Sequence, residues 1–307
     1  MPDFGIMRGF NEKLFGDKLY AGQLPTQLGK IGSENFGFFG LLDIYPNAAA
    51  AYSLRLLRVL YLGNAIRVRR SSDNAEQDIG FVSNGDLDTT ALTTFCSGTN
   101  GFVTTWYDQS GNGKNATQST AANQPQIVSS GSILNVNSKP SLKFDGITDS
   151  LLNSTFTNIN VNQFFINQVL SHNGSTLNSA SFTLSDGLSQ PAGLSFLTVY
   201  PYRLSNYSLF YDGVSVSFGT NPIASGQLNL TLEQTLSTNR SGYINSTLRG
   251  ANTANLSIAD LNNLYIGTND VGQNFDGNMQ ETILYLSDQS SNRSGIESNI
   301  NTYYGIY

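Results

Sequence analysis

Between residues 102 and 286, short runs rich in β-branched and aromatic residues alternate with turns rich in glycine and asparagine. The turns recur at intervals of roughly ten residues, which favours strands because most helices are longer than these runs. Many short strands with such spacing are typical of a β-sandwich or jelly roll. The runs lie at 102–107, 125–128, 141–144, 164–170, 181–184, 194–200, 208–211, 214–218, 228–232, 242–248, 263–266 and 277–286. The sequence therefore predicts an all-β jelly-roll sandwich.

A few segments have helical features instead. Residues 48–60 follow a Pro-Asn pair and place apolar side chains at helical spacing, so we predict the longest early helix there. Residues 89–95 follow Asp88, a good N-cap residue, and predict a second short helix. Residues 290–304 carry apolar side chains on one face and precede Gly305, which predicts a C-terminal helix. Residues 65–70 alternate apolar and arginine side chains, as a strand with one wet face does.

Charge and cysteine content exclude several classes of protein. Charged residues are 12% of the 307 residues, about half the usual share, and the net charge is −6. The chain therefore lacks the overall positive field that recruits nucleic acid, and we expect no nucleic-acid partner. With one cysteine, Cys96, and one histidine, His172, neither an intrachain disulfide nor a zinc site built from Cys and His can form. We expect His172 at a solvated loop tip.

The first forty residues differ from the rest. Residues 1–70 hold nine basic and five acidic side chains, a balance of +4, so residues 71–307 carry −10. Glycines interrupt 1–40 too often for a long helix or strand, and isolated aromatic residues stand between them. We predict an N-terminal attachment arm (1–40) before a sandwich domain (41–307); the alternative is an arm folded back on its own domain. The candidate attachment residues are Phe4, Phe10, Phe15 and Tyr20.

Targeting signals are not apparent in the sequence. The first twenty residues have no uninterrupted apolar stretch of signal-peptide type, so we expect no classical secretion. The most apolar segment, 54–62, contains two arginines and is far shorter than the ~20 residues that span a bilayer, so we expect no membrane insertion.

Several segments carry a resemblance to a known family. They are Asp43-Ile44-Tyr45, residues 65–73 (AIRVRRSSD), Thr94-Phe95-Cys96 and residues 102–115 (FVTTWYDQSGNGKN), followed by the stretch from Ile266 to Glu281. In this order they resemble the catalytic domain of the α-L-arabinofuranosidase B family. The resemblance covers about residues 41–307 and implies a concanavalin A/laminin-G-like jelly-roll β-sandwich with a few short helices.

The chemistry of that family can be compared with the residues present. A retaining glycosidase needs two carboxyl groups about 5 Å apart, one as nucleophile and one as acid/base. The resemblance implies that Asp270, in Ile-Gly-Thr-Asn-Asp, takes the acid/base role. It also implies a glutamate nucleophile after a pair of cysteines, but no glutamate lies between Glu76 and Glu233, and only Asp186 lies in the matching region. We therefore expect no enzyme activity, with an arabinofuranosidase-like glycoside hydrolase as the alternative.

Polar residues near two predicted strand ends are the candidates for ligand binding. The run Asp108-Gln109-Ser110-Gly111-Asn112-Gly113 offers oxygen ligands for Ca²⁺, but its residues also suit a tight turn, which we favour. We accordingly expect no cofactor, with Ca²⁺ the alternative. Trp106 is expected in the core, although one of the two neighbouring aromatic residues could stack on a sugar. The candidate ligand-binding residues are Trp106, Tyr107, Asp108, Asn269 and Asp270.

The chain as a whole resembles bacteriophage structural proteins. Residues 65–80 and 106–111, together with the neutral polar surface, carry this second resemblance. It implies a virion surface protein on a head, tail fibre or spike, bound to other virion proteins through residues 1–40. A homo-oligomer and receptor binding to a host surface glycan would follow from that placement. A bacterial cell-surface carbohydrate-binding module is a third hypothesis.

Overall fold

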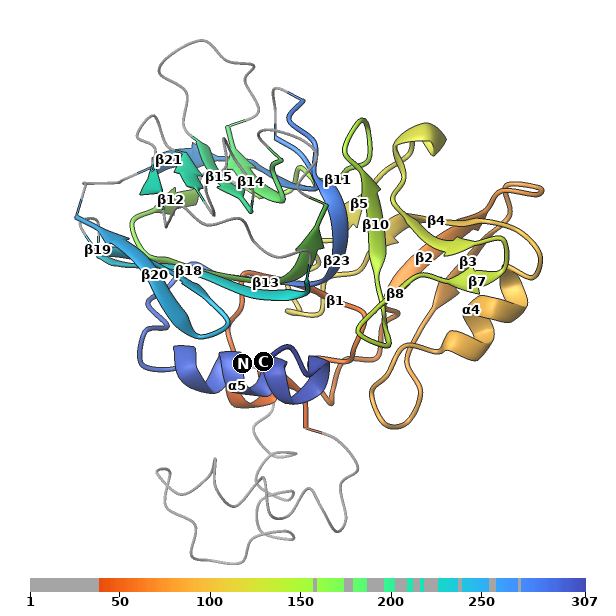
Figure 1. Ribbon diagram of the computed structural model, residues 1–307, viewed down its shortest axis with the longest axis horizontal. Coiled ribbons are helices and arrows are strands. Elements are labelled where there is room, and N and C mark those ends of the chain that lie inside the picture. The colour runs from red at the N-terminus through yellow and green to blue at the C-terminus, as the bar shows by residue number, and fades with distance from the viewer. Residues whose placement is uncertain are drawn as a thin grey trace, which may run out of the picture. The chain divides into compact units, whose positions relative to one another are not determined.

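The computed structural model describes residues 39–156, 159–173, 179–186, 196–201, 209–211, 216–217, 226–236, 239–253, 258–269 and 272–307. From Gly40 onwards the chain forms one compact unit. Antiparallel strands build two facing sheets, with a further group of strands beside them (Figure 1). The predicted all-β sandwich is confirmed.

The first sheet carries the longest strands. Its order is β10–β23–β13–β18–β19–β20, and β1 also pairs with β23. The strands are β1 (Ala50–Ser53), β10 (Leu142–Asp145), β13 (Phe164–His172), β18 (Leu228–Leu236), β19 (Asn239–Ile244), β20 (Thr247–Asn252) and β23 (Asp276–Tyr285). Because β23 pairs with β10 over its first residues and with β1 over its later ones, it ties separate parts of the chain together.

The second sheet faces the first across the core. Its order is β5–β11–β22–β14–β15–β16–β17. The strands are β5 (Ala116–Thr117), β11 (Leu151–Asn153), β14 (Phe182–Ser185), β15 (Phe196–Tyr200), β16 (Leu209–Tyr211), β17 (Val216–Ser217) and β22 (Asn263–Ile266). Strand β4 (Gly101–Trp106) pairs with β5 of the second sheet and with β6 (Gln126–Ser129), and β6 pairs with β10 of the first sheet, so the two sheets are connected at one side.

The remaining strands surround β4. Strands β2 and β3 pair with each other, β2 pairs with β4, and β6 pairs with β4, β7 and β10. The strands of this group are β2 (Ile66–Arg70), β3 (Glu76–Ile79), β6 (Gln126–Ser129) and β7 (Ser132–Ile133), and the 3-10 helix η2 (Ala121–Asn123) precedes β6. Two further strand pairs are separate: β8 (Asn135–Val136) with β9 (Lys139–Pro140), and β12 (Ile159–Val161) with β21 (Ile258–Leu261).

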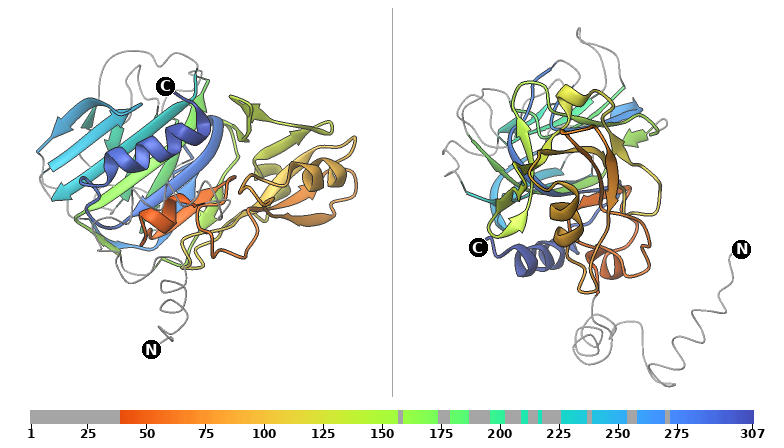
Figure 2. Two further views of the ribbon diagram at one scale, coloured as in Figure 1. Left: turned by 90° about the horizontal axis from the view of Figure 1, so that it is seen from below. Right: turned by 90° about the vertical axis from the view of Figure 1, so that its right-hand side faces the viewer.

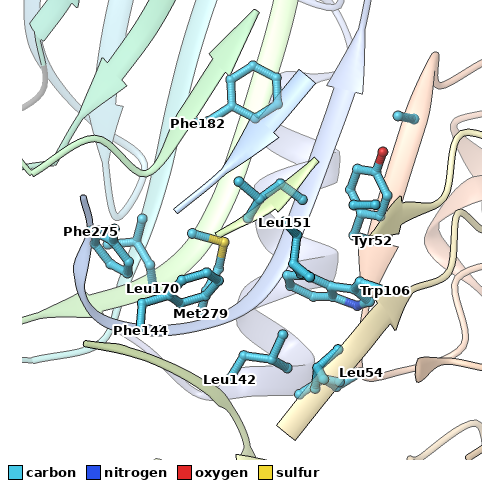
Figure 3. Close-up of a cluster of buried hydrophobic side chains, with 14 of the residues drawn as sticks. Tyr52, Leu54, Trp106, Leu142, Phe144, Leu151, Leu170, Phe182, Phe275 and Met279 are labelled. Atoms are coloured by element: carbon cyan, nitrogen blue, oxygen red, sulfur yellow. The ribbon is translucent and has the colours of Figure 1, made fainter. Parts of the chain in front are cut away.

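The interior between the sheets is apolar and rich in aromatic residues. Side chains from both sheets and from β4 meet there (Figure 3). Phe144 and Phe275 pack edge to face with ring centroids 5.8 Å apart. Aromatic pairs of this geometry add to the stabilisation that apolar burial already gives.

Helix α5 (Arg293–Tyr304) covers the outer face of the first sheet (Figure 2). It follows the prediction for 290–304 and ends at Gly305, whose φ of 61° lies in the left-handed region that glycine tolerates. Ile296 and Ile300 are fully buried against β13 and β23 residues such as Phe165 and Tyr285. Helix α4 (Thr89–Phe95) is also as predicted, and the Asp88 carboxylate accepts a hydrogen bond from the Ala91 amide. In the described part of the chain no helix is long and apolar enough to cross a bilayer.

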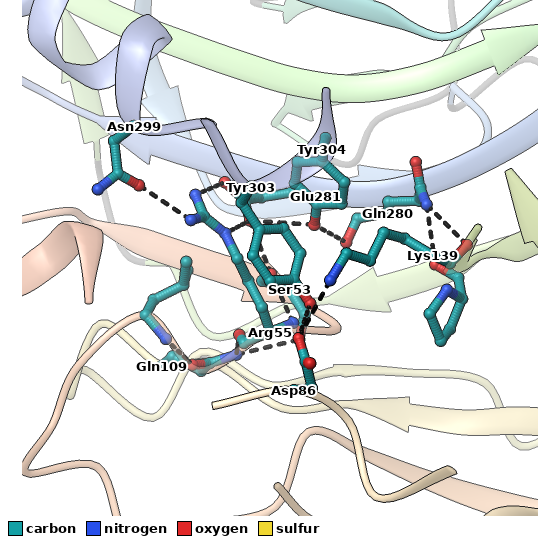
Figure 4. A network of polar contacts seen from close by, with 12 residues as sticks. Ser53, Arg55, Asp86, Gln109, Lys139, Gln280, Glu281, Asn299, Tyr303 and Tyr304 are labelled. Carbon is teal, nitrogen blue, oxygen red and sulfur yellow. Dashed lines mark hydrogen bonds and ion pairs between the residues drawn. The ribbon is translucent and has the colours of Figure 1, made fainter. Parts of the chain in front are cut away.

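A buried ion pair lies between the first sheet and α5, which contacts it through Asn299 and Tyr304. Arg55 donates to both carboxylate oxygens of Glu281 at 2.8 and 3.0 Å, and the two residues are 4% and 0% exposed (Figure 4). Tyr304 donates to the same carboxylate, and the Arg55 guanidinium lies 4.9 Å from the Tyr303 ring. The two charges compensate each other in this low-dielectric environment. Removing either partner alone would therefore leave an unpaired buried charge and destabilise the fold.

Two of the predicted helices and strands are wrong. Residues 48–60 do not form a helix: Ala50–Ser53 are the buried strand β1, which follows the short helix α3 (Leu41–Ile44). Pairing with Glu281–Leu284 of β23 overrides the helix propensity of the alanines. Residues 242–248 are not one strand but the hairpin of β19 and β20, which turns at Asn245 and Ser246 with φ of 50° and 60°. Positive φ at both central residues is typical of tight hairpin turns.

Candidate functional site

The aromatic candidates at the end of β4 belong to the core and to a surface network. Trp106 is fully buried, and its ring lies 5.9 Å from that of Tyr52. Tyr107 is half-buried and donates from its hydroxyl to Asp78 Oδ1 at 2.7 Å. Asp78 also pairs with Arg67 at 3.3 Å. In the folded chain, then, the Trp106 ring is not accessible to a sugar, and sugar stacking on Tyr107 stays a prediction.

Asp108 organises the turn that follows β4. Its buried carboxylate accepts hydrogen bonds from the Ser110 amide and hydroxyl, the Lys114 amide and the Ala51 amide, at 2.7–2.9 Å. All four donors are protein groups, so this is the tight-turn arrangement that the sequence favoured. Among the described residues, no three His, Cys, Asp or Glu side chains are gathered so as to hold a metal ion.

A second group of polar side chains lies where β15 and β22 end. Asn269 donates from Nδ2 to the Tyr200 hydroxyl at 3.1 Å and to Gln273 Oε1 at 2.8 Å. Tyr200 donates to the same Gln273 oxygen at 2.7 Å, and the Gln273 amide donates to Asn269 Oδ1 at 2.8 Å. Sequence reasoning selected Asn269 but missed both partners: Tyr200 lies 69 positions away, whereas Gln273 lies only four residues on and could have been found from the turn. Asp270 falls outside the described residues, as do Phe4, Phe10, Phe15 and Tyr20.

Three aspartates lie at this same end of the sandwich. Asp276 begins β23, directly opposite Asp145 at the end of β10, and Asp149 follows four residues after Asp145. Asp276 is half-buried, and its Oδ1 accepts a hydrogen bond from Asn173 at 2.5 Å. The Asp276 amide donates to Ser179 Oγ at 3.0 Å. These contacts fix the start of β23 against Asn173 and Ser179.

Asp145 and Asp149 differ in environment. Burial would raise the pKa of Asp145, but hydrogen bonds from the amides of Asp149, Thr148 and Ile147 lower it overall. Asp149 is only 7% exposed, and burial, reinforced by the charge of Asp145, raises the pKa of Asp149 to about 7. A carboxyl that holds its proton near neutral pH is a property of general acids, although structural groups also show it.

His172 lies at the end of β13, opposite Gly277, at this same end of the sandwich. The sequence placed it at a solvated loop tip, but the side chain is only 4% exposed. Burial lowers the pKa of His172, partly offset by the charge of Asp276. The Ser-His-Asn-Gly pattern was taken for a loop because it is rich in turn-forming residues, whereas β13 extends into it as far as His172.

The other acidic candidates lie elsewhere. Asp186 follows β14 at the end where Ser185 pairs with Asn263, whereas Phe182 pairs with Ile266 at the end that leads to Asn269. The length of β14 therefore separates Asp186 from Asn269, so Asp186 does not join this group of polar side chains. Glu281 is fully buried in its ion pair with Arg55 and does not face solvent.

Comparison with known proteins finds sequence similarity to arabinofuranosidases over part of the chain and a similar fold over most of it. Residues 43–140 match the family described as α-L-arabinofuranosidase B, catalytic. A probable α-L-arabinofuranosidase B from Aspergillus terreus is 35% identical over 119 residues, which are 37% of this chain and 22% of that protein. An α-L-arabinofuranosidase from Hypocrea jecorina is 39% identical over 84 residues, 26% of this chain and 17% of that protein. The chain thus spans about a fifth of the length of these curated relatives.

Solved structures extend the likeness of fold to most of the chain. A GH54 α-L-arabinofuranosidase variant soaked with 4-nitrophenyl α-L-arabinofuranoside superposes with a TM-score of 0.67 at 18% identity. The superposition covers 85% of this chain and 65% of that one. An arabinofuranosidase complexed with arabinofuranosyl-α-1,2-xylobiose gives a TM-score of 0.65, also at 18% identity, over 85% of this chain and 64% of that one.

These findings correct the expectation of a bacteriophage virion protein. The matching relatives are fungal arabinofuranosidases, so the predicted virion surface location, the virion partners bound through residues 1–40 and the non-enzymatic role are wrong. The resemblance to bacteriophage structural proteins was misleading because it relied on a neutral surface rich in Asn, Ser and Thr. Such a surface is a property of the β-sandwich fold and occurs in proteins of unrelated function. The division into an arm and a sandwich stays a prediction.

Proposed function

We propose that this chain is a glycoside hydrolase acting on α-L-arabinofuranosyl linkages. The observation that carries the proposal is the match of residues 43–140 to the catalytic domain of α-L-arabinofuranosidase B, inside a sandwich that shares its fold over 85% of the chain. Fold alone would not support an activity. The sequence match supplies the additional support, since it is to the catalytic domain itself.

A second catalytic carboxyl group need not lie near the matching position in the chain. Folding brings other carboxyl groups to the strand end that leads to Asp270, from β10 and from β23. A search in sequence windows misses them because Asp145 and Asp276 are 131 positions apart yet directly paired. The absence of a glutamate between 77 and 232 therefore does not exclude a second catalytic carboxyl.

Asp276 is the best placed of these groups. The Asp145 carboxylate is occupied by three backbone amides of its own turn, and Asp149 is buried and favours its neutral form. Asp276 is half-buried and held in place by Asn173 and, through its amide, by Ser179. We assign it the nucleophile role, with Asp270 as acid/base from the family resemblance.

The reaction then follows the retaining scheme. Asp270 gives its proton to the leaving-group oxygen while an Asp276 carboxylate oxygen bonds to the anomeric carbon and the glycosidic C–O bond breaks. Water, losing a proton to Asp270, next displaces the Asp276 carboxylate and releases the sugar. Asn269, Gln273 and Tyr200 supply the amide and hydroxyl groups that suit a neutral sugar.

A panel of 4-nitrophenyl glycosides tests this function. We expect the full chain to release nitrophenol from the α-L-arabinofuranoside and not from the β-D-xyloside or β-D-galactoside. Asp270→Asn should abolish release, whereas Asp78→Asn, a surface aspartate beside Tyr107, should leave it unchanged. No turnover of any arabinofuranoside by well-folded protein, or turnover that persists in Asp270→Asn, would contradict the proposal.

A further inference from the structure

The turn that follows β10 closes around one carboxylate. Asp145 Oδ1 accepts hydrogen bonds from the amides of Ile147, Thr148 and Asp149 at 2.8, 2.8 and 3.0 Å. The Asp145 amide in turn donates to Asp149 Oδ2 at 3.0 Å. Gly146 completes the bend with a φ of 73°, a conformation that glycine adopts at little cost. Residues 145–149, called the Asp145–Asp149 turn below, are therefore a self-contained loop with two carboxyl groups.

The Asp145–Asp149 turn is attached to the start of β23. Gly146 donates from its amide to the Phe275 carbonyl at 3.0 Å, and Asn274 donates from its side chain to the Ile147 carbonyl. A Cβ on Gly146 would lie 2.7 Å from Cβ of Asp276, so the two backbones approach as closely as the missing side chain allows. The Asp145–Asp149 turn is therefore in direct contact with the start of β23, where Asp276 lies.

The Asp149 carboxyl is the unusual group in the turn. It is nearly buried, and the charged groups that act on it are Asp145, which opposes a second negative charge, and Lys143 on β10, which favours one. Across the strand pair, Asp276 on β23 is another acid, and His172 on β13 favours its neutral form. An ionised Asp149 would thus add a poorly solvated negative charge beside Asp145.

We propose that protonated Asp149 is a positioning residue that keeps the Asp145–Asp149 turn closed against β23 and thereby holds Asp276 at the strand end. Loss of the proton places a second carboxylate beside Asp145 inside the turn. The turn then opens more often, and the contact between Gly146 and Phe275 is lost. The consequence for hydrolysis rests on the proposed function, whereas the consequence for the turn does not.

The sign of the effect follows from proton linkage. The carboxyl has a pKa of about 7 when folded and 3.8 when unfolded, so the folded chain binds the proton more tightly. Asp149 therefore favours folding most at low pH, and its contribution falls as pH rises from about 4 to about 7, then levels off. Opening of the turn follows the same linkage where the opened turn returns Asp149 to water: the closed state weakens by up to about tenfold per pH unit between about pH 4 and pH 7 and levels off above about pH 8.

Amide hydrogen exchange of Gly146, followed by NMR in the full chain, tests this inference. After correction for intrinsic exchange, the protection of this amide should fall about tenfold between about pH 6 and pH 8 in the natural protein. In Asp149→Asn, which cannot ionise, protection at the higher pH should equal that at the lower one. The matched control is Asp73→Asn, an exposed aspartate whose pKa is lowered to about 2 by Arg70, and it should behave as the natural protein does.

Two further readouts separate this inference from the proposed function. The ¹³C shift of the Asp149 carboxyl should titrate near pH 7 in the natural protein, which needs no variant to fold; titration below about pH 5 would overturn the inference. Unchanged Gly146 protection across the same pH range would overturn it too, even if arabinofuranoside is hydrolysed. If protection falls as expected but no arabinofuranoside is turned over, the turn inference stands and the proposed function fails.

Discussion

The turn at Asp108 and the Asp145–Asp149 turn are both built around acidic side chains. They differ in how many hydrogen-bond donors surround the buried carboxyl group and in whether a second acid lies beside it. Four protein donors surround the Asp108 carboxylate, from both its own turn and the neighbouring Ala51. Asp149, buried to a similar degree, accepts a hydrogen bond from the Asp145 amide and lies beside a second carboxylate. A fully satisfied carboxylate stabilises a turn, whereas one held near another acid makes the turn sensitive to pH.

The two turns also differ in their relation to known proteins. Asp108 lies inside the span that matches the α-L-arabinofuranosidase B catalytic family, and Asp145 and Asp149 lie just beyond it. The family match thus covers the Asp108 turn and its neighbours in the core, and it does not cover the Asp145–Asp149 turn. The strand end that we propose as the site is assembled from residues outside that span.

Replacing Asp108 should have the largest effect on stability. Asp108→Ala leaves the amides of Ala51, Ser110 and Lys114 without their acceptor, in a region where Ala51 itself is fully buried. We expect a loss of about 3 kcal/mol in the free energy of unfolding, measured by urea denaturation. A loss below about 1 kcal/mol would show that water replaces the carboxylate and that the two turns do not differ as described.

Replacing Asp145 should cost less. Its carboxylate also serves three amides, but the residue is exposed, so water can replace the lost acceptor. Asp145→Ala should destabilise the chain by about 1 kcal/mol and should also lower the pKa of Asp149, because a negative neighbour is removed. Urea denaturation and NMR titration of Asp149 measure the two effects; a pKa of Asp149 that does not fall would mean that burial alone sets it.

Removing the Tyr107 hydroxyl should have the smallest effect. Tyr107→Phe deletes one partly exposed hydrogen bond to Asp78, which keeps its ion pair with Arg67. The expected change in unfolding free energy is below about 0.5 kcal/mol, with arabinofuranoside turnover unaltered. A drop in turnover of more than about tenfold would move Tyr107 into the site and weaken our placement of the site at the other strand ends.

Local patterns predicted most of the strands but not which residues meet. The Asp88 cap, the C-terminal helix before Gly305 and the Asp108 turn follow from short-range chemistry, so the sequence reveals them. Strand β1 was missed because its burial depends on pairing with β23, which lies far along the chain.

The site was predicted less completely than the fold. Asn269 was recognised from its turn, but its contact with Tyr200, 69 positions away, leaves no local signal, and Gln273, four residues from Asn269, was missed although its contact is local. The pairing of Asp276 with Asp145 likewise depends on long-range register, which single-sequence patterns do not specify. The hypothesis of a virion protein was wrong because it relied on surface composition. Composition is a property of the fold and does not show which residues meet in a site.

The kinetic effect of replacing Asp276 tests the central claim most directly. With 4-nitrophenyl α-L-arabinofuranoside as substrate, Asp276→Asn should lower kcat/KM by at least about a thousandfold, because a lost nucleophile removes most of the rate. Asp145→Asn, its partner across the strand pair, should lower kcat/KM by less than about tenfold, since its carboxylate is occupied by its own turn. Equal effects of the two variants, or an Asp276→Asn protein that is as active as the natural one, would contradict the account.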